Sequence, residues 1–221
     1  EVGPGKGYLT EFLIKKKPSK LILIEKDRQL ETVLTNLIKN KSIKIKLIIE
    51  DALKISINKL SKNKIVLIGN LPYNVATTLI LNWLRYIHSF ESIVVMVQKE
   101  VASRLSAKEK TKHYGRTSVL AQVVADVKIK FDVAPENFFP KPKVHSSVIE
   151  IIPKEKIKFN YKKLDKFLKL SFMHKRKTLK NNLSKISSNI EEKIYKCGVN
   201  PALRPEEISP NQFIKLSEEL I

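Results

Sequence analysis

The sequence predicts an α/β fold, with buried parallel strands covered by helices, followed by a small helical domain. Two observations predict it. Short apolar runs rich in Ile, Leu and Val alternate with stretches of helical periodicity, as in sheets whose strands are buried on both faces. After residue 153 these runs cease, and the chain becomes basic and helical in pattern. We therefore assign residues 1–155 to the α/β domain and residues 156–221 to the helical domain.

The chain begins with three glycines at a spacing of two, Gly3, Gly5 and Gly7. Glycine permits positive φ and close backbone approach, which a strand-to-helix turn around a nucleoside requires. A helix is predicted over 8–17, and the apolar run 21–24 predicts a buried strand that ends at Glu25. An acidic residue at this strand tip, about 20 residues past a glycine turn, suits hydrogen bonds to ribose hydroxyls.

The second strand also ends in an acid. A helix is predicted over 29–40 and a strand over 44–49, closely followed by Asp51, whose carboxylate could accept from an adenine amine. Taken alone, each acid is equally well interpreted as a solvated strand end. Three such features at the ends of successive strands together favour a nucleoside cofactor.

The loop after the apolar run 65–68 is the most informative segment, with the sequence Gly69-Asn70-Leu71-Pro72-Tyr73. Pro72 fixes its own φ and biases Leu71 to an extended conformation, so the Leu71 carbonyl can point out of the chain. That carbonyl and the Asn70 side chain are two acceptors beside an aromatic ring, an arrangement that can hold an exocyclic amine of a flat base. The alternative is a proline turn that only ends a strand.

The rest of the first domain follows the same periodicities. We expect a helix over 75–88, a strand over 92–98, a helix from 98, and an antiparallel pair over 127–133 and 144–152. The basic segment 106–116 is either an RNA-facing loop or an ordinary mobile surface loop. Two prolines stiffen the turn at 138–143, where two adjacent phenylalanines also lie.

Charge and composition limit the function. The net charge of +20 indicates a polyanionic partner, nucleic acid first and an anionic membrane second. No apolar run approaches the roughly 18 residues that a membrane span needs. The single cysteine, Cys197, excludes an internal disulfide, argues against zinc and fits the reducing cytoplasm.

The helical domain opens with a strongly basic segment. Residues 154–185 hold twelve Lys and Arg against two acids, with apolar residues at three- and four-residue spacing. The cations at 175–177 and Lys180 could lie along an RNA backbone and supply salt-dependent affinity. The alternative is a solvated basic face.

These motifs together resemble a known family. The Asn70–Tyr73 motif resembles the signature of N6-adenine methyltransferases, and the glycines with Glu25 and Asp51 have the order and spacing of class I S-adenosylmethionine-dependent methyltransferases. Four further segments resemble the KsgA/RsmA family of small-subunit rRNA adenine dimethyltransferases: 114–118, 138–148, 172–183 and 204–209. The resemblance covers essentially the whole chain. It departs in the triplet Lys175-Arg176-Lys177, where the family usually has Arg-Arg-Lys, and in Pro140-Lys141-Pro142-Lys143-Val144, where it commonly has Pro-Pro-Pro-Lys-Val.

The resemblance implies a Rossmann-like sheet that is N-terminally incomplete here, since the family has an arm, a helix and most of a strand before the position of Glu1. It implies S-adenosylmethionine as cofactor, and two adjacent adenosines near the 3′ end of small-subunit rRNA as substrate. The partner would be the assembling 30S subunit, and the protein a cytoplasmic monomer without metal or membrane.

The resemblance also implies residue roles. The catalytic residues would be Asn70, Leu71, Pro72 and Tyr73. Cofactor contacts would come from Glu1, Gly3, Gly5, Gly7, Glu25, Asp51 and Asn70. The base would stack between Tyr73 and Phe139, with Phe138 as the second choice. RNA contacts would come from Arg116, Lys143, Lys175, Arg176, Lys177 and Lys180.

Two alternatives remain. An Erm-type enzyme would dimethylate large-subunit rRNA, but the basic triplet at 175–177 and the hairpin around 140–144 favour the small-subunit family. A non-catalytic rRNA-binding assembly factor would have no need of an intact motif and three cofactor-binding features. The four histidines are scattered and form neither a triad nor a metal-ligand spacing, so none is given a catalytic role.

Overall fold

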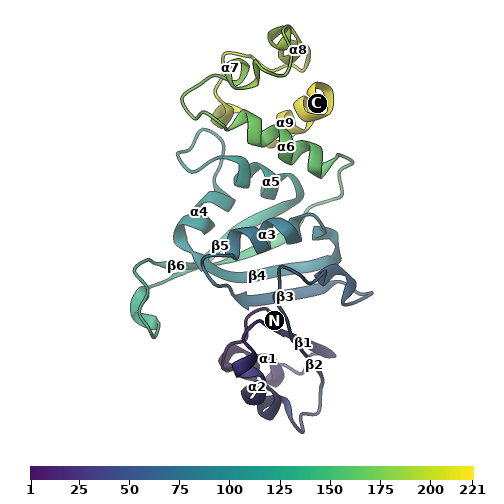
Figure 1. Ribbon diagram of the computed structural model, residues 1–221, viewed down its shortest axis with the longest axis vertical. Helices are drawn as coiled ribbons and strands as arrows, with labels where there is room; N and C mark the ends of the chain where they lie inside the picture. Colours follow the sequence, from purple (N-terminus) through teal and green to yellow (C-terminus); the bar gives the residue numbers. More distant parts are fainter. The chain divides into compact units, whose positions relative to one another are not determined.

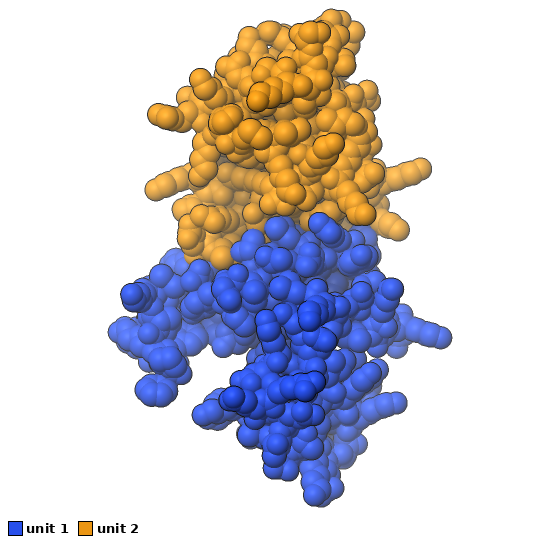
Figure 2. All heavy atoms as spheres, viewed as in Figure 1, with its two compact units in different colours: residues 1–99, 129–152 blue, residues 100–128, 153–221 orange.

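A computed structural model describes residues 1–221, which form two compact units (Figure 2). Unit 1 comprises residues 1–99 and 129–152, and unit 2 comprises residues 100–128 and 153–221. The expected division at 155/156 lies three residues from the boundary between residues 152 and 153. Residues 100–128, however, group with the C-terminal helices, because the helix α5 (Arg116–Val124) packs against α6 (Tyr161–Ser171) and α9 (Pro210–Leu220).

The strands form two hydrogen-bonded sets (Figure 1). A parallel pair is made by β1 (Lys20–Glu25) and β2 (Lys44–Ile49). The second set has the order β3-β4-β6-β5, with these bounds: β3 Ile65–Asn70, β4 Phe90–Gln98, β5 Ala125–Val133 and β6 Ser146–Pro153. Strand β4 is parallel to β3 and antiparallel to β6. The predicted strands are therefore confirmed, and the expected neighbours β5 and β6 do pair.

The first residues of the chain connect the two sets. Val2 forms parallel bridges to both Ile24 of β1 and Gly69 of β3. Its N–H donates to the Ile68 carbonyl at 2.9 Å, and the Gly3 N–H donates to the Ile24 carbonyl at 2.9 Å. Because the strands on both sides run parallel to this segment, the carboxyl ends of β1, β2 and β3 lie at one edge.

Unit 1 contains three α-helices: α1 (Tyr8–Lys15), α2 (Glu31–Ile38) and α3 (Ala76–Leu84). All three are shorter than the sequence indicated, α1 by two residues at its C-terminal end. The predicted helix 29–40 begins with a 3-10 turn at Arg28–Leu30, because the Asp27 side chain accepts the Gln29 N–H and caps that turn. The predicted helix 75–88 ends at Leu84, and a separate 3-10 turn follows at Ile87–Ser89.

Unit 2 is helical, as predicted for its C-terminal part. Besides α5, α6 and α9 it contains α4 (Lys99–Ser106), α7 (Leu179–Leu183) and α8 (Ile190–Lys196). The first residue of α4, Lys99, belongs to unit 1. The apolar stripe read from the sequence faces the core, since Leu164, Phe167 and Leu168 are fully buried. In the whole chain, none of the helices combines the length and apolarity that crossing a membrane requires.

Gly69 shows how closely the chain start packs on β3. A Cβ added there would lie 2.6 Å from the Val2 carbonyl oxygen, which is backbone and cannot turn aside. We expect Gly69→Ala to lower the free energy of unfolding by about 1–3 kcal/mol, the cost of overpacking a tight site. Denaturant unfolding measures this. Gly115→Ala is the control, because its added Cβ meets nothing within 4 Å; an equal loss in both variants would contradict the prediction.

Candidate active site

The glycine turn after Val2 joins the chain start to α1. Gly3, Gly5 and Gly7 all have positive φ, at 69°, 59° and 88°. The conformation is one that L side chains rarely adopt, which explains why the turn needs glycine. A Cβ added at Gly5 would meet nothing within 4 Å, so the backbone there is open to close approach by a ligand.

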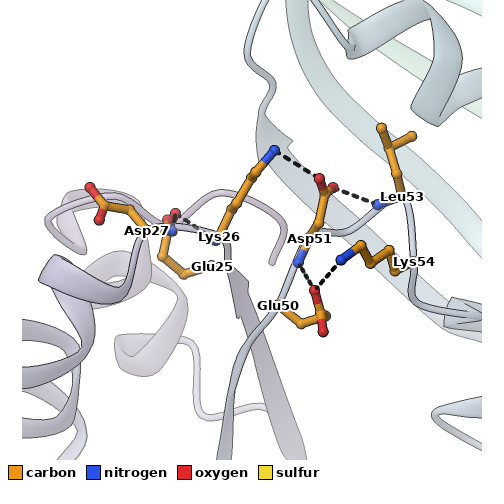
Figure 3. A network of polar contacts seen from close by, with 7 residues as sticks. All are labelled: Glu25, Lys26, Asp27, Glu50, Asp51, Leu53 and Lys54. Atoms are coloured by element: carbon orange, nitrogen blue, oxygen red, sulfur yellow. Dashed lines mark hydrogen bonds and ion pairs between the residues drawn. The ribbon is translucent and has the colours of Figure 1, made fainter.

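Glu25 fixes this turn against the tip of β1. Its carboxylate accepts N–H groups from Lys26 at 2.7 Å and Asp27 at 2.9 Å (Figure 3). It also accepts the Gly5 N–H at 3.0 Å, and only 8% of the residue is exposed. Three backbone donors hold the side chain in one orientation. The predicted acid at the strand tip is therefore placed beside the predicted glycine turn.

Asp51 lies at the tip of the neighbouring β2 and pairs with Lys26. The Lys26 Nζ is 2.8 Å from Asp51 Oδ2, and Asp51 Oδ1 accepts the Leu53 N–H at 3.0 Å (Figure 3). The hydrogen bond from Lys26, the larger cause, and that from the Leu53 N–H together hold the pKa of the Asp51 carboxyl below its usual value. The sequence analysis missed Lys26, because a lysine among 42 basic residues gives no signal of its partner.

The side chain of Glu1 points to α1. Its Oε2 accepts the hydroxyl of the fully buried Thr10 at 2.6 Å. Burial raises the pKa of the Glu1 carboxyl, although the Thr10 hydrogen bond opposes the shift. This residue therefore has a protein partner next to the glycine turn.

Backbone hydrogen bonds fix the loop after β3. The Leu71 side chain is 1% exposed, and its N–H donates to the Met96 carbonyl at 3.2 Å, so the loop is fixed to the core. The Pro72 carbonyl accepts the N–H groups of Val75 and Ala76, which starts α3. Asn70 is exposed at the strand tip, and within the protein neither its side chain nor the Leu71 carbonyl is hydrogen-bonded. The Asn70 side chain is thus open to a ligand, whereas the Leu71 carbonyl has no partner within the protein but belongs to a residue that is only 1% exposed.

Tyr73 has a partner that the sequence did not reveal. Its hydroxyl lies 2.7 Å from the Ser146 Oγ, at the first residue of β6. Ser146 is fully buried and Tyr73 half-buried. Since 73 residues separate the two, no local pattern could have indicated the contact.

The segment before β6 carries the predicted stacking aromatic. Phe139 is fully exposed and does not contact Tyr73, whereas Phe138 is half-buried. Lys143 is also exposed on this segment. The structure thus brings Asn70, Leu71 and Tyr73 together but leaves Phe139 in solvent.

The predicted RNA-binding residues of unit 2 differ in their contacts. Arg116 donates to Asp165 Oδ1 from Nε at 2.7 Å and from Nη2 at 2.6 Å, and the Asp165 side chain is only 10% exposed. Arg116 therefore ties α5 to α6. Lys180 pairs with Glu191 at 3.2 Å. The triplet 175–177 is exposed and has no ion pair, and its first residue lines a basic hollow of about 770 Å³.

Similar structures define the fold. A dimethyladenosine transferase from Plasmodium falciparum shares the fold with a TM-score of 0.78 at 24% identity, over 97% of this chain and 86% of that one. The 23S rRNA methyltransferase ErmE does so with a TM-score of 0.71 at 19% identity, over 99% and 88%. The fold is that of a methyltransferase with a Rossmann-like sheet and a helical C-terminal part.

Sequence comparison gives the family. The family model described as ribosomal RNA adenine dimethylase matches residues 1–221. The ribosomal RNA small subunit methyltransferase A of Ehrlichia ruminantium is 42% identical over 98% of this chain and 84% of its own length. The protein of that name from Pelagibacter ubique is 39% identical over 99% and 84%. The chain belongs to the ribosomal RNA adenine dimethylase family and is an S-adenosylmethionine-dependent methyltransferase.

Proposed function

We propose that the protein dimethylates N6 of two adjacent adenosines near the 3′ end of small-subunit rRNA, in the cytoplasm and as a monomer without metal. The loop after β3 carries this proposal: two free acceptors stand beside a tyrosine, at the sheet edge that holds the glycine turn. The relatives at 42% and 39% identity, both named for the small subunit, favour that subunit over the large one. ErmE, at 19% identity, supports the fold alone.

The cofactor fits the first two strand tips. The open backbone at Gly5 admits the cofactor, Glu25 accepts from the ribose hydroxyls, and Asp51 accepts from the adenine amine in place of Lys26. Glu1, Gly3, Gly7 and Asn70 complete the wall of the site. When bound, S-adenosylmethionine supplies an activated methyl group on sulfur.

The motif residues prepare the nitrogen. The lone pair of N6 is delocalised into the purine ring, so the amine is a poor nucleophile. The Asn70 side-chain oxygen and the Leu71 carbonyl accept its two hydrogens and favour a pyramidal nitrogen, while Pro72 keeps the carbonyl in place. The lone pair so exposed would accept the methyl group that the cofactor would supply, and N6 would then lose a proton to water. Tyr73 stacks on the flipped base, and Phe139 covers its other face.

The exposed cations contact RNA phosphates. Lys143 does so in unit 1, and the triplet 175–177 does so in unit 2, with Arg116 and Lys180 sharing their charges between protein and RNA. We expect the Lys175→Ala/Lys177→Ala variant to reduce the slope of log K against log salt by about 0.7–0.9 per lysine. Filter binding to small subunits at several salt concentrations measures the slope.

The control for this prediction is a Lys20→Ala/Lys62→Ala variant. It changes two exposed lysines at the amino ends of β1 and β3, away from the edge that carries the motif. It removes the same charge and should leave the slope unchanged. If both variants lower the slope equally, the effect comes from net charge and not from contacts of the triplet.

The function itself is tested by methyl transfer from labelled S-adenosylmethionine to unmodified small and large subunits, with the modified nucleoside identified by mass. Dimethyladenosine on small subunits alone is the expected result. Transfer to large subunits would indicate an Erm-type enzyme. Binding without transfer would indicate the non-catalytic assembly factor and overturn the mechanism.

A further inference from the structure

We propose that Ser146 is a positioning residue for methyl transfer, because its hydroxyl holds the ring of Tyr73 in the plane that receives the adenine. The inference rests on the proposed function. It starts from the hydrogen bond of 2.7 Å between the Ser146 Oγ and the Tyr73 hydroxyl. A hydrogen bond at the hydroxyl fixes the position of the oxygen and so the rotation about the first side-chain bond of tyrosine. Because a phenol hydroxyl lies preferentially in the plane of its ring, the bond also favours one ring plane about the second.

Ser146 is itself held rigidly. It is fully buried, and its Cα pairs with Gln98 in the antiparallel ladder between β6 and β4. The residue before it is tied to the first residue of α4, directly after β4, since the His145 carbonyl accepts the Lys99 N–H at 2.9 Å. The residue after it, Ser147, donates to Asp132 Oδ1 at 2.6 Å. The hydroxyl therefore presents a fixed point to the tyrosine.

Asp132 secures this point from the neighbouring strand β5. Its second oxygen lies 2.5 Å from the Lys99 Nζ, so one carboxylate connects the end of β4 to the start of β6. The Lys99 and Ser147 hydrogen bonds hold the pKa of Asp132 below its usual value, so the carboxylate stays charged at neutral pH. The contacts around Ser146 thus persist under assay conditions.

Of the two rings proposed to stack on the base, only that of Tyr73 is held in place before the base binds. Phe139 is fully exposed, seven residues before Ser146, whereas Tyr73 is half-buried and hydrogen-bonded. The orientation of the base during transfer is therefore set by Tyr73, and through it by Ser146. A base that tilts moves N6 away from the two acceptors of the motif, which lowers the rate of transfer more than the binding of RNA.

The test is a double-mutant cycle with Ser146→Ala and Tyr73→Phe, which each remove one side of the hydrogen bond and keep the aromatic ring. We expect either change to lower kcat about fivefold, the ordinary value of one hydrogen bond. The KM for small subunits and the Kd for the cofactor should change less than about twofold. The double variant should be no slower than either single variant, since both remove the same contact.

Ser171→Ala is the matched control, because Ser171 is an equally buried serine whose hydroxyl donates to the Phe167 carbonyl and takes no part in the contacts around Tyr73. Its effect should multiply with that of Tyr73→Phe. Ser146→Cys keeps a side chain of similar size with a weaker donor, so it should restore part of the rate. It replaces Ser146→Ala in the cycle if the alanine variant is too unstable to assay.

A second readout reports the base directly. Small subunits carrying 2-aminopurine at the target position lose fluorescence when that base stacks on an aromatic ring. We expect less quenching with Ser146→Ala and Tyr73→Phe than with the unchanged protein.

The inference is overturned if Ser146→Ala keeps the full kcat, or if its effect multiplies with that of Tyr73→Phe. Absence of transfer by the unchanged protein is a different outcome, since it would contradict the proposed function itself.

Discussion

Asn70→Ala is expected to lower kcat by about a hundredfold or more, with small-subunit binding retained. The change removes one of the two acceptors that hold the N6 hydrogens, and loss of one such preorganised group costs about 10²–10³ in rate. The fold should survive, because Asn70 is exposed and its side chain makes no hydrogen bond within the protein. Single-turnover transfer with saturating cofactor measures the rate of the chemical step.

Asn74→Ala is the matched control, since it removes another exposed asparagine side chain four residues further along the same loop. It should keep most of the rate. If Asn70→Ala transfers methyl groups as fast as this control, the amide does not act on the target amine.

Glu25→Ala is expected to weaken cofactor binding by about ten- to a hundredfold, as when hydrogen bonds to a charged group are lost. It should also lower the free energy of unfolding by about 2–4 kcal/mol, because three backbone N–H groups lose their acceptor. Titration calorimetry with S-adenosylmethionine and denaturant unfolding measure the two effects.

Glu91→Ala serves as control, because Glu91 is an exposed acid near the start of β4, at the end of the strand away from the edge where Glu25 lies. It should bind the cofactor almost normally. Glu25→Gln keeps one amide oxygen, so it should recover part of the stability. Normal cofactor affinity in Glu25→Ala would show that the acid only holds the turn.

The sheet and its functional edge were largely predictable from the sequence. Each buried parallel strand gives a continuous apolar run, and the residue that ends the run marks the carboxyl end of the strand. This relation places Glu25, Asp51 and Asn70 at one edge, and the parallel pairing around Val2 confirms that edge. The roles of these residues stay predictions.

The contacts between distant segments were not predictable. Tyr73 contacts Ser146, which is 73 positions away in the sequence, and Arg116 contacts Asp165, which is 49 positions away. A serine or an aspartate has no periodicity that marks its partner. Arg116 therefore looked like one more RNA-facing cation, although its guanidinium is held by a nearly buried carboxylate.

The grouping of residues 100–128 was missed for a similar reason. Charge and periodicity change after residue 153, which suggested a single boundary there. The helix α5 nevertheless presents its buried residues, such as Val119 and Leu120, to helices that follow much later in the chain. A change in charge and periodicity marks a position in the sequence, but it does not show which helices and strands pack into the same core.

The bridges of Val2 give the site an intrinsic reporter. The amide protons of Val2 and Gly3 are donated to opposite sides, one to β3 and one to β1. Their rates of exchange with deuterated solvent therefore report separately on the strand that leads to the motif and on the strand that ends at Glu25. We expect cofactor to slow both rates together. Slowing at Gly3 alone would mean that the two halves of the site open independently.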